Sequence, residues 1–229
     1  MCIRDRSKES CLVIELFMRK NNIKKKSPKK GKLKNKIVSK PSKSYTAKDI
    51  EVLEGLEPVR KRPGMYIGGT DILAMHHLVS EVLDNSMDEV VAGHANKVEI
   101  NLKNNSTIEI SDNGRGIPVD KHPKFKIPAA EVIMTTLHSG GKFSNNSYKT
   151  SGGLHGVGIS VVNALSKKLT LEIARDKKYF SQVYQQGNPK TKLKSFSKGS
   201  LKKGTRIVFS PDTEIFGDDA YFDSSIIYN

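Results

Sequence analysis

The segment from residue 73 to residue 92 constrains the fold more than any other part of the chain. Apolar residues recur at helical spacing along it, and Gly93 follows as a stop signal. A pattern of this length predicts an α-helix with one face in a hydrophobic core. The residues predicted for that core face are Leu78, Val79, Val82, Leu83, Met87 and Val90.

The opposite face of this predicted helix carries a polar stripe without Lys or Arg. At about 100° per residue, His77, Glu81, Asn85 and Asp88 fall within about 80° of one another. A carboxylate near a histidine can polarise a water molecule, and an amide oxygen suits a hard cation such as Mg²⁺. The stripe is therefore typical of a catalytic face, and equally of an ordinary solvated one.

The remaining pattern, helices followed by antiparallel-looking strands, predicts a two-layer α/β (α+β) sandwich. Residues 97–103 and 107–111 alternate apolar and polar and predict a hairpin. Pro58, Pro63 and Gly64 predict a loop. Other expected strands are 169–174, 179–185 and 205–209, and other expected helices are 49–57, 131–137 and 159–166.

The net charge of +15 is unevenly distributed. Residues 1–44 hold 15 basic and three acidic residues, whereas residues 45–229 hold 24 basic and 21 acidic residues. We interpret 1–44 as a basic, disordered tail and 45–229 as one domain. The tail is either a non-specific arm for DNA phosphates or a solubilising extension. No apolar run reaches the ~20 residues of a membrane helix, and only two cysteines occur, which favours a cytoplasmic protein.

Two glycine-containing motifs suggest a ligand site. In "SDNGRGIP" (111–118), Asp112 follows a predicted strand and can accept a hydrogen bond from an exocyclic amine. Its glycines permit close approach of a flat ligand, although a plain Asn-Gly turn looks the same. In "TSGGLHGVGIS" (150–160), four glycines precede a predicted helix, an arrangement typical of anion binding. The motif is neither a Walker A loop nor a convincing dinucleotide fingerprint.

Together these motifs resemble, in order, those of the GHKL ATPases with their Bergerat nucleotide fold. The resemblance implies a mixed sheet with helices on one face. The strings "RKRPGMYIG" (60–68), "HHLVSEVLDNSMDEVVAGH" (76–94) and 137–167 resemble the ATPase subunits of bacterial type IIA topoisomerases. Residues 45–66 and 141–167 are more similar to the topoisomerase IV subunits than to the gyrase subunits. The resemblance covers about residues 45–225.

The resemblance implies roles for individual residues. Glu81 would be the general base, tuned by His77, and Asn85 would ligate Mg²⁺. Asp112 would bind the adenine amine with Thr205, and Arg115 would pair with Glu89. The other residues implied in binding ATP are Tyr45, Asp88, Gly116, Ile117, Pro118, Lys142, Tyr148, Gly153, Leu154, His155, Gly156, Val157 and Gly158.

The resemblance also implies partners: DNA, the DNA-cleaving partner subunit, and a second copy of the chain, but no membrane. It implies a nucleotide domain that is incomplete at its C-terminus. Three alternatives remain open: the ATPase subunit of a gyrase, another GHKL member such as a histidine kinase, and a non-enzymatic nucleic-acid-binding protein that acts through the basic tail.

Overall fold

The computed structural model describes residues 46–104, 106–140, 156–199 and 201–227. The chain divides into two compact units, 1–50 and 51–229. In the first unit the described element is a single 3₁₀ turn, η1 (Ala47–Asp49). The second unit contains all the other described elements. Among the described residues, no helix is both long and apolar enough to cross a membrane.

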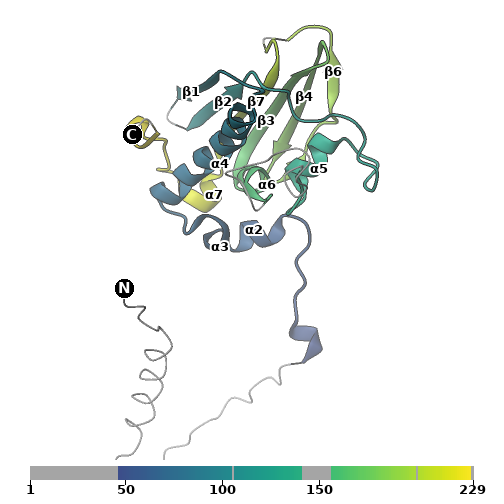
Figure 1. The fold of residues 1–229 in the computed structure, drawn as a ribbon. Coiled ribbons are helices and arrows are strands. Elements are labelled where there is room, and N and C mark those ends of the chain that lie inside the picture. Colours follow the sequence, from purple (N-terminus) through teal and green to yellow (C-terminus); the bar gives the residue numbers. More distant parts are fainter. Residues whose placement is uncertain (1–45, 105, 141–155, 200, 228–229) are drawn as a thin grey trace, which may run out of the picture. The chain divides into compact units, whose positions relative to one another are not determined.

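The described strands of the second unit form one antiparallel sheet, in the order β1-β2-β7-β3-β4-β5, with β6 also paired to β4 (Figure 1). Every pairing between these strands is antiparallel, so the expected mixed sheet is corrected in this respect. The strands are β1 (Val98–Asn104), β2 (Thr107–Asp112), β3 (Ser166–Arg175), β4 (Lys178–Gln185), β5 (Asn188–Pro189), β6 (Lys194–Phe196) and β7 (Gly204–Pro211).

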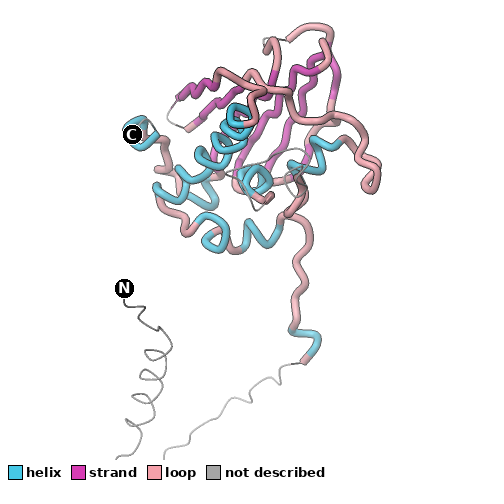
Figure 2. The backbone as a smooth tube through the Cα atoms, in the orientation of Figure 1, coloured by secondary structure: helices cyan, strands magenta, loops and turns pink. Residues whose placement is uncertain are grey.

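Helices gather on one side of this sheet, which gives the two-layer arrangement that the sequence predicts (Figures 1 and 2). The long α4 and the shorter α5 and α6 confirm three predicted helices. The helices are α2 (Glu57–Lys61), α3 (Gly64–Ile67), α4 (Ile72–Val91), α5 (Ala129–Thr135), α6 (Gly158–Ala164), α7 (Thr213–Phe216) and α8 (Ser224–Ile227).

The prediction of a helix over 49–57 and a loop after it is wrong. Residues 50–54 are without helical structure, and the first α-helix begins only at Glu57. Pro58 lies in the first turn of α2, where its missing N–H costs no intrahelical hydrogen bond. The proline therefore starts a helix here instead of ending one, and a second short helix, α3, follows Pro63.

The core lies between the helical layer and alternate residues of the central strands. In β2 and β7, Ile108 pairs with Phe209 and Ile110 with Ile207. The register of β3 places Leu169 and Leu171 beside the same two β7 residues. All of these side chains are buried, because residues two apart in a strand point to the same face.

The buried face of α4 is turned relative to the prediction. Met87, expected in the core, is 43% exposed, whereas Ser86 is buried and Asp88, expected on the polar stripe, is only 3% exposed. Leu78 and Val82 are buried as predicted. Helix α4 packs against β2, β7 and α6, so neighbours cover more of its surface than a simple amphipathic helix would bury. Polar residues consequently lie on the inner side of α4.

The segment after β7 is anchored to α4 through a buried histidine. His76 Nδ1 lies 2.6 Å from the Ile72 carbonyl oxygen, and its Nε2 accepts a hydrogen bond from the Asp223 N–H at 2.9 Å. Phe222 makes edge-to-face contacts with His76 and with Phe209. This packing joins the helical layer to the end of the described chain.

Arg60 of α2 joins three elements near the start of α7. Its guanidinium donates to the Ala164 carbonyl at 2.8 Å and forms an ion pair with Asp212 at 2.7 Å. Asp212 is buried and caps α7 by accepting from the Glu214 N–H. Burial alone would raise the pKa of Asp212, but hydrogen bonds from Gln186 and Arg60 hold that pKa below its usual value.

We predict that Arg60→Ala destabilises the fold by about 2–3 kcal/mol at neutral pH, because it leaves a buried carboxylate without its cation. The stabilising effect of a lowered carboxyl pKa is present above the unfolded value and is lost as pH falls through the folded value. The difference between variant and wild type in urea denaturation should therefore shrink in acid. Arg62→Ala, at an exposed position nearby, is the control; an equal loss in both variants would contradict the role of the ion pair.

Candidate functional site

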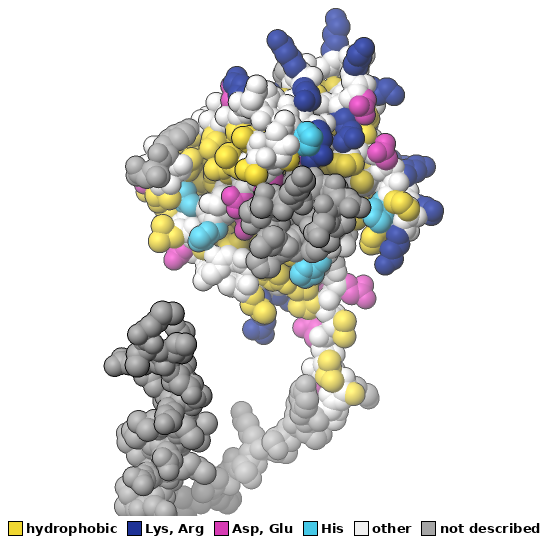
Figure 3. All heavy atoms as spheres, viewed as in Figure 1, with side chains coloured by type: hydrophobic (Ala, Val, Ile, Leu, Met, Phe, Trp, Pro, Cys, Tyr) yellow, Lys and Arg dark blue, Asp and Glu magenta, His cyan; other side chains and the backbone are white. Residues whose placement is uncertain are grey.

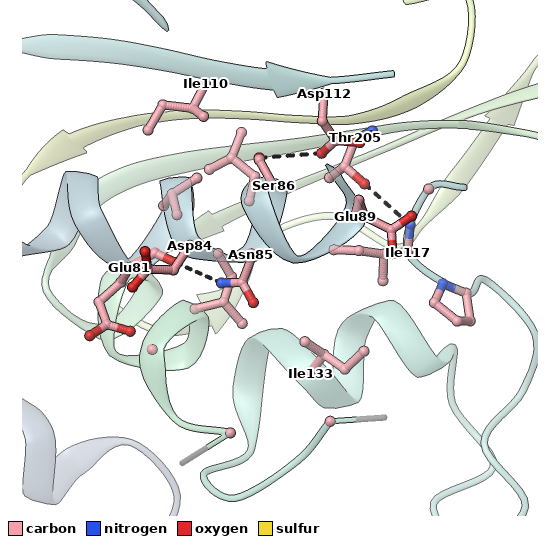
Figure 4. A pocket seen from close by; sticks show the side chains of 18 of the residues that line it. Glu81, Asp84, Asn85, Ser86, Glu89, Ile110, Asp112, Ile117, Ile133 and Thr205 are labelled. Atoms are coloured by element: carbon pink, nitrogen blue, oxygen red, sulfur yellow. Dashed lines mark hydrogen bonds between the residues drawn. The ribbon is translucent and has the colours of Figure 1, made fainter. Parts of the chain in front are cut away.

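A cavity of about 380 Å³ opens between α4, α5 and the start of α6, with strands of the sheet as its floor (Figure 4). Its walls combine a row of α4 polar groups with isoleucines from other elements. The lining residues are Glu81, Val82, Asp84, Asn85, Ser86, Glu89, Ile110, Asp112, Arg115, Gly116, Ile117, Pro118, Ile133, Ser139, Gly140, Gly156, Val157, Gly158, Ile159, Arg175, Thr205 and Ile207.

Asp112 ends β2 and is only 7% exposed. Its Oδ1 accepts from the N–H of Gly114 at 2.8 Å and of Thr205 at 3.4 Å, and its Oδ2 accepts from the Ser86 hydroxyl at 3.4 Å. Burial raises the pKa of the Asp112 carboxyl, and the hydrogen bonds from these backbone groups offset the increase only in part. The site therefore holds a desolvated hydrogen-bond acceptor at a fixed position.

Two glycines are required for this close packing around Asp112. A Cβ on Gly204 would lie 2.0 Å from the Asp112 carbonyl oxygen, and the φ of Gly204 is +104°. A Cβ on Gly114 would lie 2.7 Å from Glu89 Oε2. Side chains at these positions would push β7 and the turn after β2 away from the carboxylate, so the glycines act through close approach.

An ion pair fixes the turn after β2 against α4. The guanidinium of Arg115 binds Glu89 at 2.7 Å and 3.2 Å, and the Arg115 N–H donates to the same carboxylate at 2.8 Å. Next along the turn, the Ile117 N–H donates to the Thr205 hydroxyl at 3.2 Å. Because a two-point guanidinium contact fixes orientation as well as distance, the Arg115 side chain is held at the cavity wall.

Glu81 lies at the other end of the cavity from Asp112, with Asn85 between them (Figure 4). The Asn85 amide nitrogen donates to the Glu81 carbonyl oxygen at 2.7 Å, and its amide oxygen is turned towards the cavity. A Cβ on Gly158 would lie 1.9 Å from Glu81 Oε2, so the first residue of α6 touches the carboxylate. The cavity wall therefore carries a carboxylate and, one turn further along α4, an amide.

The structure brings most of the predicted site residues that it describes to this one cavity. Two are placed elsewhere: His77 is exposed and Asp88 is buried, and neither lines the cavity. Six predicted residues lie outside the described residues, namely Tyr45, Lys142, Tyr148, Gly153, Leu154 and His155. Gly140 and Gly156, which flank the undescribed part of the glycine-rich segment, both line the cavity.

Several lining residues were not predicted from the sequence. Ser86 follows Asn85 directly, but its hydroxyl turns towards the sheet and Asp112. Arg175, at the end of β3, donates to the Gly116 carbonyl oxygen at 3.0 Å. Ile133 of α5 forms part of the apolar wall. At about 100° per residue, Ser86 falls on the core face of the predicted helix, and this angle could have placed it on the sheet side of α4. The contact of Arg175 could not have been predicted in this way, because it depends on the order of strands in the sheet.

Within the described residues there is no cluster of three or more His, Cys, Asp or Glu side chains suited to hold a metal by themselves. Mg²⁺ typically takes only one or two protein ligands and completes its shell with water and phosphate oxygens. The amide oxygen of Asn85 beside Glu81 fits that kind of partial site.

Comparison with known proteins identifies the class of protein that this fold and cavity define. Residues 70–215 match the family model described as "Histidine kinase-, DNA gyrase B-, and HSP90-like ATPase". The chain belongs to this family of ATPases. The predicted GHKL membership and fold class are thereby confirmed.

Similarity to individual proteins narrows the class further. The B subunit of DNA topoisomerase 4 from Rickettsia bellii is 59% identical over 196 residues, which cover 85% of this chain and 29% of that protein. The Caulobacter vibrioides protein of the same name is 54% identical over 195 residues, with 85% and 28% covered. The B subunit of DNA gyrase from Spiroplasma citri is 50% identical over 187 residues, with 81% and 29% covered. The chain thus spans less than a third of these relatives.

A solved structure supports the same assignment of the fold. The 43K ATPase domain of Thermus thermophilus gyrase B, in complex with an aminocoumarin, superposes with a TM-score of 0.66 at 42% identity. The match covers 76% of this chain and 43% of that one. The predicted resemblance to type IIA topoisomerase ATPase regions, with topoisomerase IV subunits most prominent, is therefore confirmed.

We predict that Asp112→Asn stabilises the ligand-free fold at neutral pH. An acid whose folded pKa is raised contributes most stability below its unfolded value of 3.8, and that contribution is lost as pH rises through the folded value. An amide at this position escapes the loss and keeps an oxygen for the Gly114 and Thr205 N–H groups. Thermal unfolding at several pH values would show equal midpoints in strong acid and a higher midpoint for the variant near pH 7. A lower midpoint at neutral pH would contradict the burial argument.

Proposed function

We propose that this chain is the ATP-binding and ATP-hydrolysing region of a type IIA DNA topoisomerase, in the B subunit of topoisomerase IV. Nucleotide-driven closure of a dimer would then support DNA strand passage, decatenation and relaxation by the whole enzyme. The observation that carries the proposal is the cavity with a buried acceptor, Asp112, at one end and a carboxylate–amide pair, Glu81 and Asn85, at the other.

The Asp112 end of the cavity suits an adenine ring. Its carboxylate would accept the exocyclic amine, while the turn 116–118 and Ile133 supply apolar walls for the ring. Thr205 would support adenine through water. Arg115, held by Glu89, would lie along the ring. A guanine would present a keto oxygen to the carboxylate instead of a donor, so the site favours ATP over GTP.

The Glu81 end suits the phosphates. Glu81 would activate a water molecule for attack on the γ-phosphate, and Asn85 would ligate a Mg²⁺ ion, which supplies charge neutralisation when bound. The backbone of residues 156–158 at the start of α6 would contact phosphate oxygens. Lys142, Tyr148 and residues 153–155 are proposed to complete the phosphate contacts, and Tyr45 to reach a second copy. His77 is proposed to tune Glu81, and Asp88 to support the site from behind the cavity.

The partners and location in this proposal follow from the relatives' names. DNA, the DNA-cleaving partner subunit and a second copy of the chain are proposed partners, in the bacterial cytoplasm. The B subunit of a gyrase is the second candidate, favoured by the 50% identity to the Spiroplasma citri protein. Supercoiling of relaxed plasmid by the complete enzyme would identify gyrase, whereas decatenation without supercoiling would identify topoisomerase IV.

Nucleotide binding is the first test of the proposed function. A non-hydrolysable ATP analogue with Mg²⁺ should raise the melting temperature of this chain, because a ligand of the native state stabilises it by mass action. Asp112→Asn should weaken binding by about 1–3 kcal/mol, roughly 5- to 150-fold in Kd, since its amide presents donors to the adenine amine. An unchanged Kd would remove Asp112 from adenine binding. If deletion of residues 1–44 abolishes binding of the analogue, the result would favour the alternative of a non-enzymatic nucleic-acid-binding protein that acts through its basic tail.

Hydrolysis should depend on Glu81 but binding should not. In a full-length protein with this domain, Glu81→Ala should lower turnover by about 10²–10⁴-fold, equivalent to roughly 3–5 kcal/mol in the barrier. Its affinity for the analogue should stay close to that of wild type. Asp84→Ala is the matched control, because Asp84 lies about one turn further along α4 and lines the same cavity. Equal turnover in the Glu81 variant and wild type would refute the assignment.

A further inference from the structure

The near-neutral charge of residues 45–229 conceals a separation of charge along the chain. Residues 166–206, from β3 to the start of β7, contain twelve basic and only two acidic residues. The remainder of 45–229 contains twelve basic and nineteen acidic residues. One part of the domain is therefore strongly basic, and the part that supplies most of the nucleotide cavity is acidic.

Half of these twelve basic residues lie at or near one edge of the sheet, that of β4 with β5 and β6. Residues 188–196 run beside β4, where β5 and β6 pair with it and the Lys190 N–H donates to the Val183 carbonyl. Figure 3 shows Lys and Arg side chains concentrated in the upper part of the molecule, where the ends of β4 and β6 lie in Figure 1. We define the edge surface by six exposed lysines: Lys177, Lys178, Lys190, Lys192, Lys194 and Lys198.

The charges of the edge surface are not neutralised by their surroundings. The two acidic residues of this part of the chain already have partners: Glu172 binds Arg206 at 2.9 Å, and Asp176 binds Arg175 at 3.4 Å. None of the six lysines forms an ion pair with a described residue. Six exposed cations at one edge create a positive field that attracts a polyanion.

Protection of a sheet edge against aggregation is the simpler explanation, because edge strands commonly carry lysine. Lysines that serve this purpose lie on the edge strand itself. Here the lysines extend beyond the edge strand to the β3–β4 turn at Lys177 and past β6 to Lys198. Their number and spread therefore point to a binding surface.

We propose that the edge surface binds the phosphate backbone of duplex DNA. From Lys190 to Lys198 the chain spans at most about 28 Å when extended, which matches about eight base pairs of B-DNA. Binding is through phosphates and independent of base sequence. The choice of DNA among polyanions rests on the proposed function, since the relatives are DNA topoisomerase and gyrase subunits by name; the existence of a polyanion surface does not.

The salt dependence of DNA binding tests this surface. Affinity for a fluorescent duplex of about two helical turns would be measured by anisotropy between about 50 and 200 mM salt. The slope of log K against log salt is negative, and each lost phosphate contact reduces its magnitude by about 0.9. The triple variant Lys190→Gln, Lys192→Gln, Lys194→Gln should therefore reduce the magnitude of the slope by about 2–3. The basic tail is common to wild type and every variant and does not enter the difference.

A charge-matched control separates this contact from a general loss of charge. The control is the triple variant Lys61→Gln, Lys97→Gln, Lys103→Gln. Lys61 lies in α2, whereas Lys103 in β1 and Lys97 just before β1 lie at the opposite edge of the sheet. This variant should leave the slope within error of wild type. Equal slopes in the two triple variants would overturn the proposal. If the edge variant binds DNA as tightly as wild type but aggregates, the lysines protect the sheet edge. That result would also overturn the DNA-binding proposal.

Two further measurements distinguish the outcomes. The edge variant should keep the melting-temperature shift caused by the ATP analogue. Absence of that shift in wild type would refute the proposed function. The proposal for the edge surface is decided by the salt dependence of DNA affinity alone. Binding to phosphatidylglycerol vesicles that falls in the edge variant, with DNA binding unchanged, would assign the surface to a membrane and overturn the DNA proposal.

Discussion

The burial of one carboxylate, that of Asp112, sets the geometry around it. The carboxylate lies where β2 ends, between α4 and the first residues of β7, and it is held by three donors from three segments. Gly114 and Gly204 are needed because any side chain there would enter the space that the carboxylate and its backbone occupy. The cost of desolvating the charge appears as a raised pKa, so the fold retains an unfavourable group at the place where a ligand contact is proposed.

Helix α4 explains both the success and the limits of prediction from sequence. Its length, its start and its apolar spacing are local properties, and they predicted the helix and the residues Glu81 and Asn85 correctly as neighbours on one side. The orientation of that side depends on what packs against the helix. Because β2, β7 and α6 all contact α4, Asp88 became buried and Met87 exposed, which periodicity alone does not reveal.

The same distinction applies to the rest of the chain. The β1–β2 hairpin and the alternating strands β3, β4 and β7 were predictable, since period-two patterns are local. The α2 helix was missed because Pro58 was interpreted as a breaker, although a proline is compatible with a first turn. The contacts of Ser86 with Asp112 and of Arg175 with Gly116 join residues 26 and 59 positions apart. The first depends on how α4 packs against β2, and the second on the order of strands in the sheet.

Charge separation within the domain gives the cavity and the edge surface different physical environments. A triphosphate in this cavity would lie along an α4 wall that carries Glu81, Asp84 and Glu89. The Glu89 carboxylate is paired with the guanidinium of Arg115. In the proposed function, a divalent cation at Asn85 and a lysine would add positive charge beside the phosphates. The edge surface needs no such cation, because its own lysines exceed the nearby carboxylates. If both proposals hold, magnesium depletion weakens nucleotide binding in the cavity, because it removes a charge that the phosphates use there. At the edge it strengthens DNA binding, because it removes only a competitor for DNA phosphates.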